Sequence, residues 1–190
     1  MKRIVIFASG SGTNAENLIQ YFNQKKEVSV VQVLTNNPHA KVIDRCNNLK
    51  ISCLSFNRTA FYVENHILAI LKTINPDVIV LAGFLWKFPE SILKEFPNKV
   101  INVHPALLPK YGGKGMYGMR VHEAVVANNE KETGITIHYV NEHYDEGAII
   151  FQASCTVGSN DTAATVAEKI HKLEMEHFPR VVESFLFPNE

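Results

Sequence analysis

The chain has 190 residues, 46% of them hydrophobic, and its 19 lysine and arginine residues balance 19 aspartate and glutamate residues. This length suits one well-buried domain, and the neutral charge provides no net attraction to nucleic acid or to a membrane surface, so we expect small-molecule partners. The three cysteines are an odd number without C-x-x-C spacing, which argues against a disulfide framework and a thiolate zinc site. Because the first apolar run is too short for a signal peptide and no segment approaches a membrane span, we expect a cytoplasmic protein.

The first half of the chain alternates strand and helix patterns. Residues 3–9 are a β-branched run, residues 13–25 have apolar side chains at helical spacing, and residues 28–35 return to a strand pattern. The alternation continues with a helix expected over 39–49, a strand near 52–54, a helix over 60–74, and strands in PDVIVLAGF and NKVINVH. Continuous apolar strands are typical of a sheet with helices on both faces, so we predict an α/β fold with a doubly wound, mostly parallel sheet.

The second half of the chain has a different character. Residues 104–120 contain two prolines and four glycines without a sustained period, which predicts a long loop of the kind that is usually functional. A helix near 119–127, strands in TGITIHYV and GAIIFQASCTV, and a helix from about 161 that Asp161 caps complete the pattern. We expect the last strands to form an antiparallel edge of the sheet.

A glycine-rich turn follows the first strand. It consists of Gly10, Ser11, Gly12, Thr13 and Asn14, and with the next alanine it has the spacing G-x-G-x-x-A. Free backbone N–H groups at the start of a helix bind anions. A dinucleotide site would also need an acidic residue or an arginine after the second strand, where this chain has Thr35-Asn36-Asn37, so we predict a phosphate monoester as the ligand. Close packing by the glycines is the alternative.

A second group of polar residues falls at predicted strand ends. Asn102 and His104 are two residues apart at the carboxyl end of a strand, where both side chains point to one side and open parallel sheets bind ligands. Asp145 is in the turn NEHYDEGAII, between the two late strands. If the fold brings Asp145 to His104, the carboxylate raises the pKa of the imidazole and orients the ring. The alternative is that each is an ordinary packed or surface residue.

The motifs S-G-x-G-T-N, I-N-V-H-P-A-L-L-P and D-E-G-x-I together resemble those of the glycinamide ribonucleotide formyltransferases, and the resemblance covers almost the whole chain. It implies a Rossmann-like formyltransferase fold in a single domain over 1–190, with a phosphate-binding half of about 1–100 and a catalytic and folate-site half of about 100–190. It also implies transfer of the formyl group of 10-formyltetrahydrofolate, as co-substrate, to the amine of glycinamide ribonucleotide in purine biosynthesis. No metal is required, and we expect a monomer or a homodimer.

The resemblance assigns roles to individual residues. Asn102, His104 and Asp145 match the catalytic trio, and the turn from Gly10 to Asn14 matches the substrate phosphate site. Amine attack on the formyl carbon generates an oxyanion, and the folate nitrogen needs a proton before it leaves. Asn102 would donate to the oxyanion, a protonated His104 would assist both steps, and Asp145 would keep the imidazole charged and aimed.

The resemblance also suggests substrate contacts. The folate-binding residues would be Leu85, Trp86, Lys87 and Phe88, with Asn102, the turn residues Asn141, Glu142, His143 and Tyr144, and Arg58 near the glutamate tail. Glu174 matches a glutamate that contacts the ribose. Core packing is the alternative for the aromatic residues, and a solvated helix face is the alternative for Glu174. The loop after Pro109 is longer and richer in glycine than the family form, and Lys110 and Lys114 are expected at its solvated surface.

Several alternative functions remain at this stage. Methionyl-tRNA formyltransferases share the N-x-H-P-x-L-L-P type of motif but have a further C-terminal domain and a basic surface for tRNA. Formyltetrahydrofolate deformylases normally have an additional N-terminal domain, and a sugar-nucleotide formyltransferase would share the phosphate site. A non-catalytic nucleotide-binding module is a fourth alternative. A metal site from His138, His143 and Asp145 is disfavoured because the histidines are expected on opposite faces.

Overall fold

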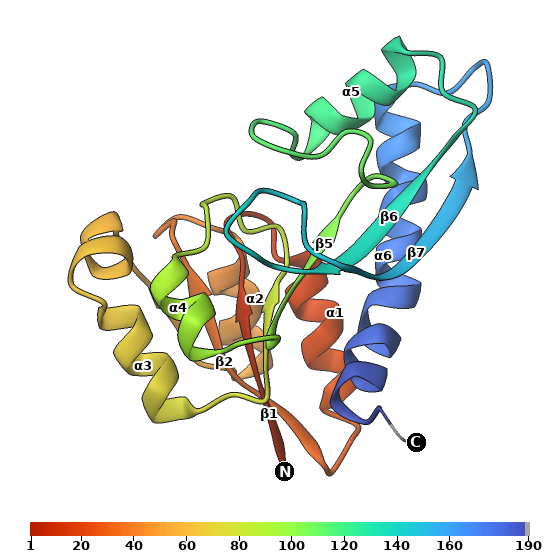
Figure 1. Cartoon of the computed structure of the whole chain (residues 1–190). Helices are drawn as coiled ribbons and strands as arrows, with labels where there is room; N and C mark the ends of the chain where they lie inside the picture. The colour runs from red at the N-terminus through yellow and green to blue at the C-terminus, as the bar shows by residue number, and fades with distance from the viewer. Residues whose placement is uncertain (189–190) are drawn as a thin grey trace.

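A computed structural model describes residues 1–188 and contains one seven-stranded sheet with the strand order β3-β2-β1-β4-β5-β6-β7 (Figure 1). The strands are β1 (Lys2–Phe7), β2 (Val28–Thr35), β3 (Cys53–Ser55), β4 (Val78–Leu81), β5 (Val100–His104), β6 (Glu132–Tyr139) and β7 (Ile149–Thr156). Strands β1 to β5 pair in parallel, whereas β6 pairs antiparallel with both β5 and β7. The predicted parallel sheet with an antiparallel edge is confirmed.

Helices cover both faces of the sheet. They are α1 (Thr13–Phe22), α2 (Val42–Leu49), the π-helical segment η1 (Thr59–Val63), α3 (His66–Ile74), α4 (Glu90–Glu95), α5 (Met119–Ala127) and α6 (Ala163–Leu186). Alternate residues of β1 enter two separate cores: Ile4 and Ile6 pack with α1, α2 and α6, whereas Val5 and Phe7 pack with α3 and α4. Burial on both faces explains why the parallel strands are continuously apolar.

Three local features differ from the sequence predictions. The helix expected over 60–74 is divided, because Asn65 adopts a left-handed conformation with φ of 53° between η1 and α3. Helix α4 lies where no element was expected. The residue that caps α6 is Thr162 and not Asp161: Thr162 accepts a hydrogen bond from the Thr165 N–H, while Asp161 accepts one from the Thr165 hydroxyl.

Helix α6 continues through Pro179 because α1 supplies a replacement hydrogen bond. Proline has no N–H, so the carbonyl four residues earlier, that of Met175, loses its helical partner. The Asn17 side chain of α1 donates to that carbonyl through Nδ2 at 2.8 Å. The contact joins the helix of the glycine-rich turn to the helix that holds Glu174.

Candidate active site

A cavity of about 630 Å³ lies at the carboxyl ends of the central strands. Its lining includes the whole turn from Gly10 to Asn14, the catalytic candidates Asn102, His104 and Asp145, and Glu174 of α6. The remaining walls come from residues 82–85, from the glycine-rich segment 113–118 and from the start of α5. The cavity therefore lies at the edge of the sheet where strand direction predicted that ligands bind.

The glycine-rich turn is shaped by contact with α2. Gly12 has φ of 75°, and a Cβ at this position would lie 2.5 Å from the Val42 Cβ, so only glycine fits without displacement. No side chain of residues 1–188 caps the N-terminus of α1, which leaves its first N–H groups available to an anion.

An arginine to which the sequence analysis gave no role contacts and stabilises the same turn. Arg45 of α2 donates from Nε to the Ser11 carbonyl at 2.8 Å and forms an ion pair with Glu16 in the first turn of α1. Its position between two helices depends on tertiary packing, and no motif in the sequence pointed to it. The turn is therefore held by backbone shape and by a side chain outside the motif.

His104 contacts both Asp145 and the backbone of the long loop. Its Nδ1 lies 3.5 Å from Asp145 Oδ2, and its Nε2 lies 2.7 Å from the Tyr111 carbonyl, to which it donates. The side chain is only 4% exposed. Burial lowers the pKa of His104 and outweighs the raising effects of the Asp145 charge and the Tyr111 carbonyl. The expected contact with Asp145 is present and its charge raises the pKa of His104 as expected, but the expectation that Asp145 keeps the imidazole charged is wrong, because burial dominates.

Asp145 also contacts His138 and the loop backbone. Its Oδ1 lies 3.6 Å from His138 Nε2, and its Oδ2 accepts the Gly113 N–H at 3.0 Å. Burial raises the pKa of Asp145, but the contacts with the His138 and His104 imidazoles and the hydrogen bond from the Gly113 N–H together hold that pKa below its usual range. Asp145 is accordingly ionised at neutral pH.

His138 orients the side chain of Asn102. His138 Nδ1 lies 2.8 Å from the Tyr139 carbonyl and must donate to it, which leaves Nε2 as the acceptor of the neutral ring. Asn102 Nδ2 lies 3.1 Å from that Nε2 and therefore donates. Among residues 1–188 the other N–H of this amide has no hydrogen-bond partner, and Asn102 lines the cavity. The antiparallel pairing of β5 with β6 sets Asn102 opposite His138, a register that the sequence alone did not give.

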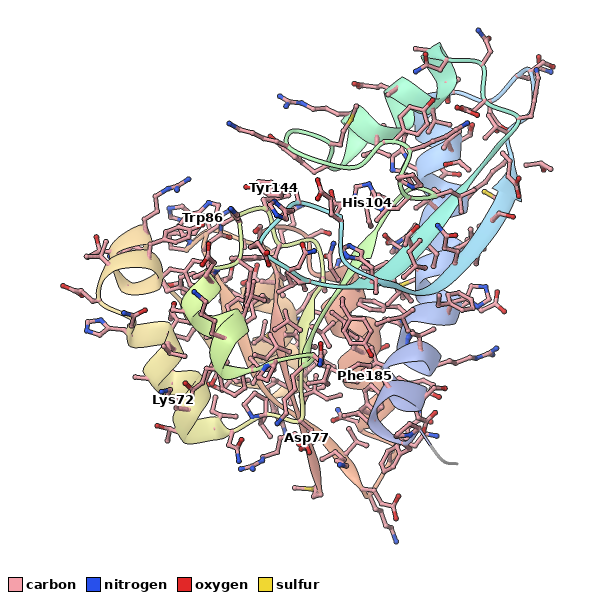
Figure 2. All side chains as sticks on the ribbon, in the orientation of Figure 1. Lys72, Asp77, Trp86, His104, Tyr144 and Phe185 are labelled. Atoms are coloured by element: carbon pink, nitrogen blue, oxygen red, sulfur yellow. The ribbon has the colours of Figure 1, made fainter. Side chains whose placement is uncertain are left out.

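The residues predicted to bind folate are only partly brought to the cavity. Leu85 lines it, is 47% exposed and donates its N–H to Ser9 Oγ at 2.9 Å, and Tyr144 also lines it. Figure 2 shows Trp86, Tyr144 and His104 in one row across the middle of the molecule. The cavity lining does not include Arg58, Trp86, Lys87, Phe88, Asn141, Glu142 or His143.

The aromatic residues after β4 have separate environments. Phe88 is 3% exposed and packs against Phe7 and Phe61 in the core, as the packing alternative anticipated. Trp86 carries the Arg58 guanidinium over its ring at 4.6 Å. Arg58 and Trp86 thus form a cationic and aromatic surface near the Leu85 side of the cavity.

Glu174 is joined to the glycine-rich turn. Its Oε2 accepts a hydrogen bond from Asn14 Nδ2 at 2.9 Å and lies 3.7 Å from His171 Nδ1. The nearby Glu174 carboxylate raises the pKa of His171. Of the two loop lysines, Lys110 is paired with Glu130 at 3.0 Å, whereas Lys114 is exposed and lines the cavity.

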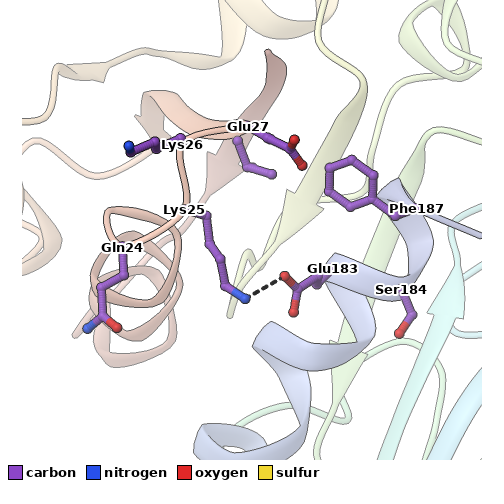
Figure 3. Close-up of a pocket in the computed structure, with 8 residues that line it drawn as sticks. Gln24, Lys25, Lys26, Glu27, Glu183, Ser184 and Phe187 are labelled. Carbon is purple, nitrogen blue, oxygen red and sulfur yellow. Dashed lines mark ion pairs between the residues drawn. The ribbon is translucent and has the colours of Figure 1, made fainter. Parts of the chain in front are cut away.

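A second cavity, of about 490 Å³, lies at the turn between α1 and β2 (Figure 3). Lys25 and Glu183 form an ion pair across it at 2.8 Å. Because these charges neutralise each other and the pocket holds none of the predicted catalytic residues, we place the chemistry in the first cavity.

Other classes of site receive no support from the described residues. Residues 1–188 contain no group of three or more histidine, cysteine, aspartate or glutamate side chains arranged to hold a metal ion. His138 and Asp145 are neighbours, but His143 is exposed and faces Glu142 at 3.8 Å. A search of the same residues for a helix both long enough and apolar enough to cross a membrane found none.

The chain is similar to known formyltransferases in sequence and in fold. A family model described as "Formyl transferase" matches residues 2–182. The phosphoribosylglycinamide formyltransferase of Bacillus subtilis is 33% identical, over 98% of this chain and 95% of the relative. The crystal structure of the Bacillus halodurans phosphoribosylglycinamide formyltransferase superposes with a TM-score of 0.88 at 33% identity, covering 100% of this chain and 97% of that one. A chloroplastic relative from Arabidopsis thaliana is 32% identical over 92% of this chain, which spans 63% of that longer protein.

The fold, the motif-bearing cavity and the family match define the class: the chain belongs to the formyl transferase family. The expected Rossmann-like formyltransferase fold is confirmed by the solved structures. Within the family, the chain belongs with the phosphoribosylglycinamide formyltransferases, folate-dependent enzymes of purine biosynthesis, and the resemblance carried by its motifs is confirmed.

Proposed function

We propose that Asn102, His104 and Asp145 carry out the transfer of the formyl group of 10-formyltetrahydrofolate to the amine of glycinamide ribonucleotide. The observation that supports this most directly is the meeting of the three side chains at one cavity that also contains the glycine-rich turn. The cavity thus combines an anion-binding helix terminus with groups that move a proton and stabilise an oxyanion. This combination suits an acceptor that carries a phosphate and an amine.

The reaction proceeds by direct attack of the neutral amine on the formyl carbon. A C–N bond forms, and the formyl oxygen takes up the electron pair as an oxyanion. The free N–H of Asn102 donates to this oxyanion, a contact worth about 3–4 kcal/mol in a preorganised site. The amine nitrogen then loses a proton, the folate nitrogen gains one, and the bond between that nitrogen and the formyl carbon breaks.

His104 moves the proton between the two nitrogens. Since burial lowers its pKa, His104 is neutral before reaction and accepts the proton from the attacking amine. Asp145, at 3.5 Å, stabilises the transient imidazolium until the proton passes to the folate nitrogen. Substrate takes the place of the Tyr111 carbonyl at Nε2, and the proton of the neutral ring then lies on Nδ1, toward Asp145, so that Nε2 is the nitrogen that accepts the proton. No metal takes part in these steps.

The other predicted contacts form part of the same proposal. The phosphate binds to the turn Gly10 to Asn14, and the ribose binds beside Glu174. The pterin of the folate lies against the backbone from Leu85 to Phe88 and the turn from Asn141 to Tyr144, with its glutamate tail toward Arg58. One domain then comprises a phosphate-binding half of about 1–100 and a catalytic and folate half of about 100–190, with small molecules as its partners.

The test is turnover of 10-formyltetrahydrofolate in the presence of glycinamide ribonucleotide, followed by the absorbance change as the folate loses its formyl group. We expect loss of the formyl group only when the ribonucleotide is present. Loss without the ribonucleotide would instead identify a deformylase. Binding of the ribonucleotide without any turnover would identify a non-catalytic module.

A further inference from the structure

A histidine that no step above uses lines the same cavity. His122 is on α5, and its side chain is 6% exposed. Its Nδ1 is sealed from solvent and has no hydrogen-bond partner among residues 1–188. Buried polar groups in native proteins are nearly always paired, so the unpaired Nδ1 of a ring that lines a ligand cavity indicates a contact that a bound ligand completes once the ring turns toward it.

The charged neighbours of His122 place it on the ribonucleotide side of the cavity. Burial lowers the pKa of His122, Glu174 opposes this effect, and His104 adds to it, so the ring is neutral at pH 7 and within electrostatic range of both residues. Glu174 is itself bonded to Asn14 in the first turn of α1, where the phosphate is proposed to bind. His122 lines the same cavity as Glu174 and the turn from Gly10 to Asn14, so we place it beside the segment of the acceptor that connects its phosphate to its amine.

The chemistry of that segment matches the chemistry of the side chains. A carboxylate only accepts hydrogen bonds, and Glu174 Oε2 already accepts one from Asn14. A neutral imidazole donates from one nitrogen and accepts at the other, which suits a hydroxyl group. A ribose presents two neighbouring hydroxyls, so one can donate to Glu174 while the other pairs with the imidazole.

We propose that His122 binds a ribose hydroxyl of the acceptor, beside the hydroxyl held by Glu174, and makes the enzyme selective for a ribose over a deoxyribose. This inference rests on the proposed function. It assigns His122 to acceptor recognition and leaves proton transfer to His104.

The experiment compares the wild type with His122→Phe and His122→Asn in the full chain. Steady-state kinetics are measured with glycinamide ribonucleotide and with its 2′-deoxy and 3′-deoxy analogues. For the wild type, we expect kcat/KM to fall about tenfold on each analogue, because each lacks a hydroxyl that Glu174 or His122 binds. His122→Phe raises the KM for the ribonucleotide about tenfold and no longer discriminates against one of the two analogues, while the KM for the folate is unchanged. His122→Asn retains part of the discrimination.

His66→Asn is the matched control, because His66 is an exposed histidine on α3, remote from the cavity lining. Thermal unfolding of each variant checks that the fold is retained. If folded His122→Phe still discriminated against both deoxy analogues as the wild type does, this inference alone would be overturned. A rise in the KM for the folate, with no rise in the KM for the ribonucleotide, would overturn it as well. Absence of turnover by the wild type would overturn the proposed function, and this inference with it.

Discussion

The two halves of the sheet hold their functional groups in different ways. In the parallel half, the turn from Gly10 to Asn14 offers backbone N–H groups whose direction follows from the strand, the helix and the fit of Gly12 against Val42. Where β5 pairs antiparallel with β6, contacts between side chains from β5, β6 and the turn after β6 place His104, Asp145, Asn102 and His138, together with contacts to nearby backbone groups. A site held by backbone tolerates many side-chain changes, whereas a site held by side chains fails when one group is removed.

The largest expected effect follows from removal of His104. His104→Ala leaves no group to carry the proton from the amine to the folate nitrogen, so we expect kcat to fall by about 10²–10⁴. Single-turnover kinetics and calorimetric binding of the ribonucleotide provide the measurement, and binding should stay nearly intact. A kcat within threefold of the wild type would contradict the assignment.

Asp145→Asn removes a charge while keeping nearly the same shape. Because the charge of Asp145 raises the pKa of His104, its loss lets that pKa fall further below the ordinary value. The neutral ring is the competent form, so the acid limb of the pH profile of kcat/KM moves to lower pH. At pH 7, kcat falls at least about tenfold because the transient imidazolium is less stable. A pH profile superimposable on that of the wild type would refute this role.

Gly12→Ala tests whether backbone geometry holds the glycine-rich turn in place. The left-handed φ and the contact with Val42 predict a loss of about 1–3 kcal/mol in the free energy of unfolding, seen as a lower Tm and a lower denaturation midpoint. Gly10→Ala is the control, because a Cβ at Gly10 would meet no heavy atom within 4 Å. Equal destabilisation by both substitutions would show that the turn is not fixed by α2.

The smallest effect is expected at Asp161, before α6. Lys169, the Gly158 N–H and the Thr165 hydroxyl lower the pKa of Asp161 to about 2. The stabilisation is therefore present above the ordinary carboxyl pKa of about 4 and is lost as the pH falls toward 2. Asp161→Asn should lower Tm by about 1–2 °C at pH 7 and by less at pH 2, as thermal melts across this range would show. The same Tm loss at both pH values would contradict the assignment.

Sequence reasoning was most successful where local pattern decides structure. The apolar runs and the G-x-G spacing predicted β1, α1 and β2 and the position of the turn, and strand alternation placed Asn102 and His104 on one side. The break at Asn65 was missed because apolar spacing does not reveal a single left-handed residue.

The rest of the site depends on contacts between distant segments. His138 faces Asn102 only because β6 returns antiparallel in one register, and His122 reaches the cavity only because α5 lies above it. The pKa of His104 depends on the depth of its burial, which no spacing of residues expresses. Neither Arg45 nor His122 belongs to a motif, so only the structure shows that they lie at the site.

The bond from Asn17 to the Met175 carbonyl has an evolutionary consequence. A proline at position 179 is tolerated inside α6 because a side chain of α1 occupies the carbonyl that the proline leaves free. The two positions are 162 residues apart, yet a substitution at one changes what is acceptable at the other. Positions 17 and 179 should therefore change together among related formyltransferases. Where position 179 is proline, we expect a side chain that donates a hydrogen bond at position 17.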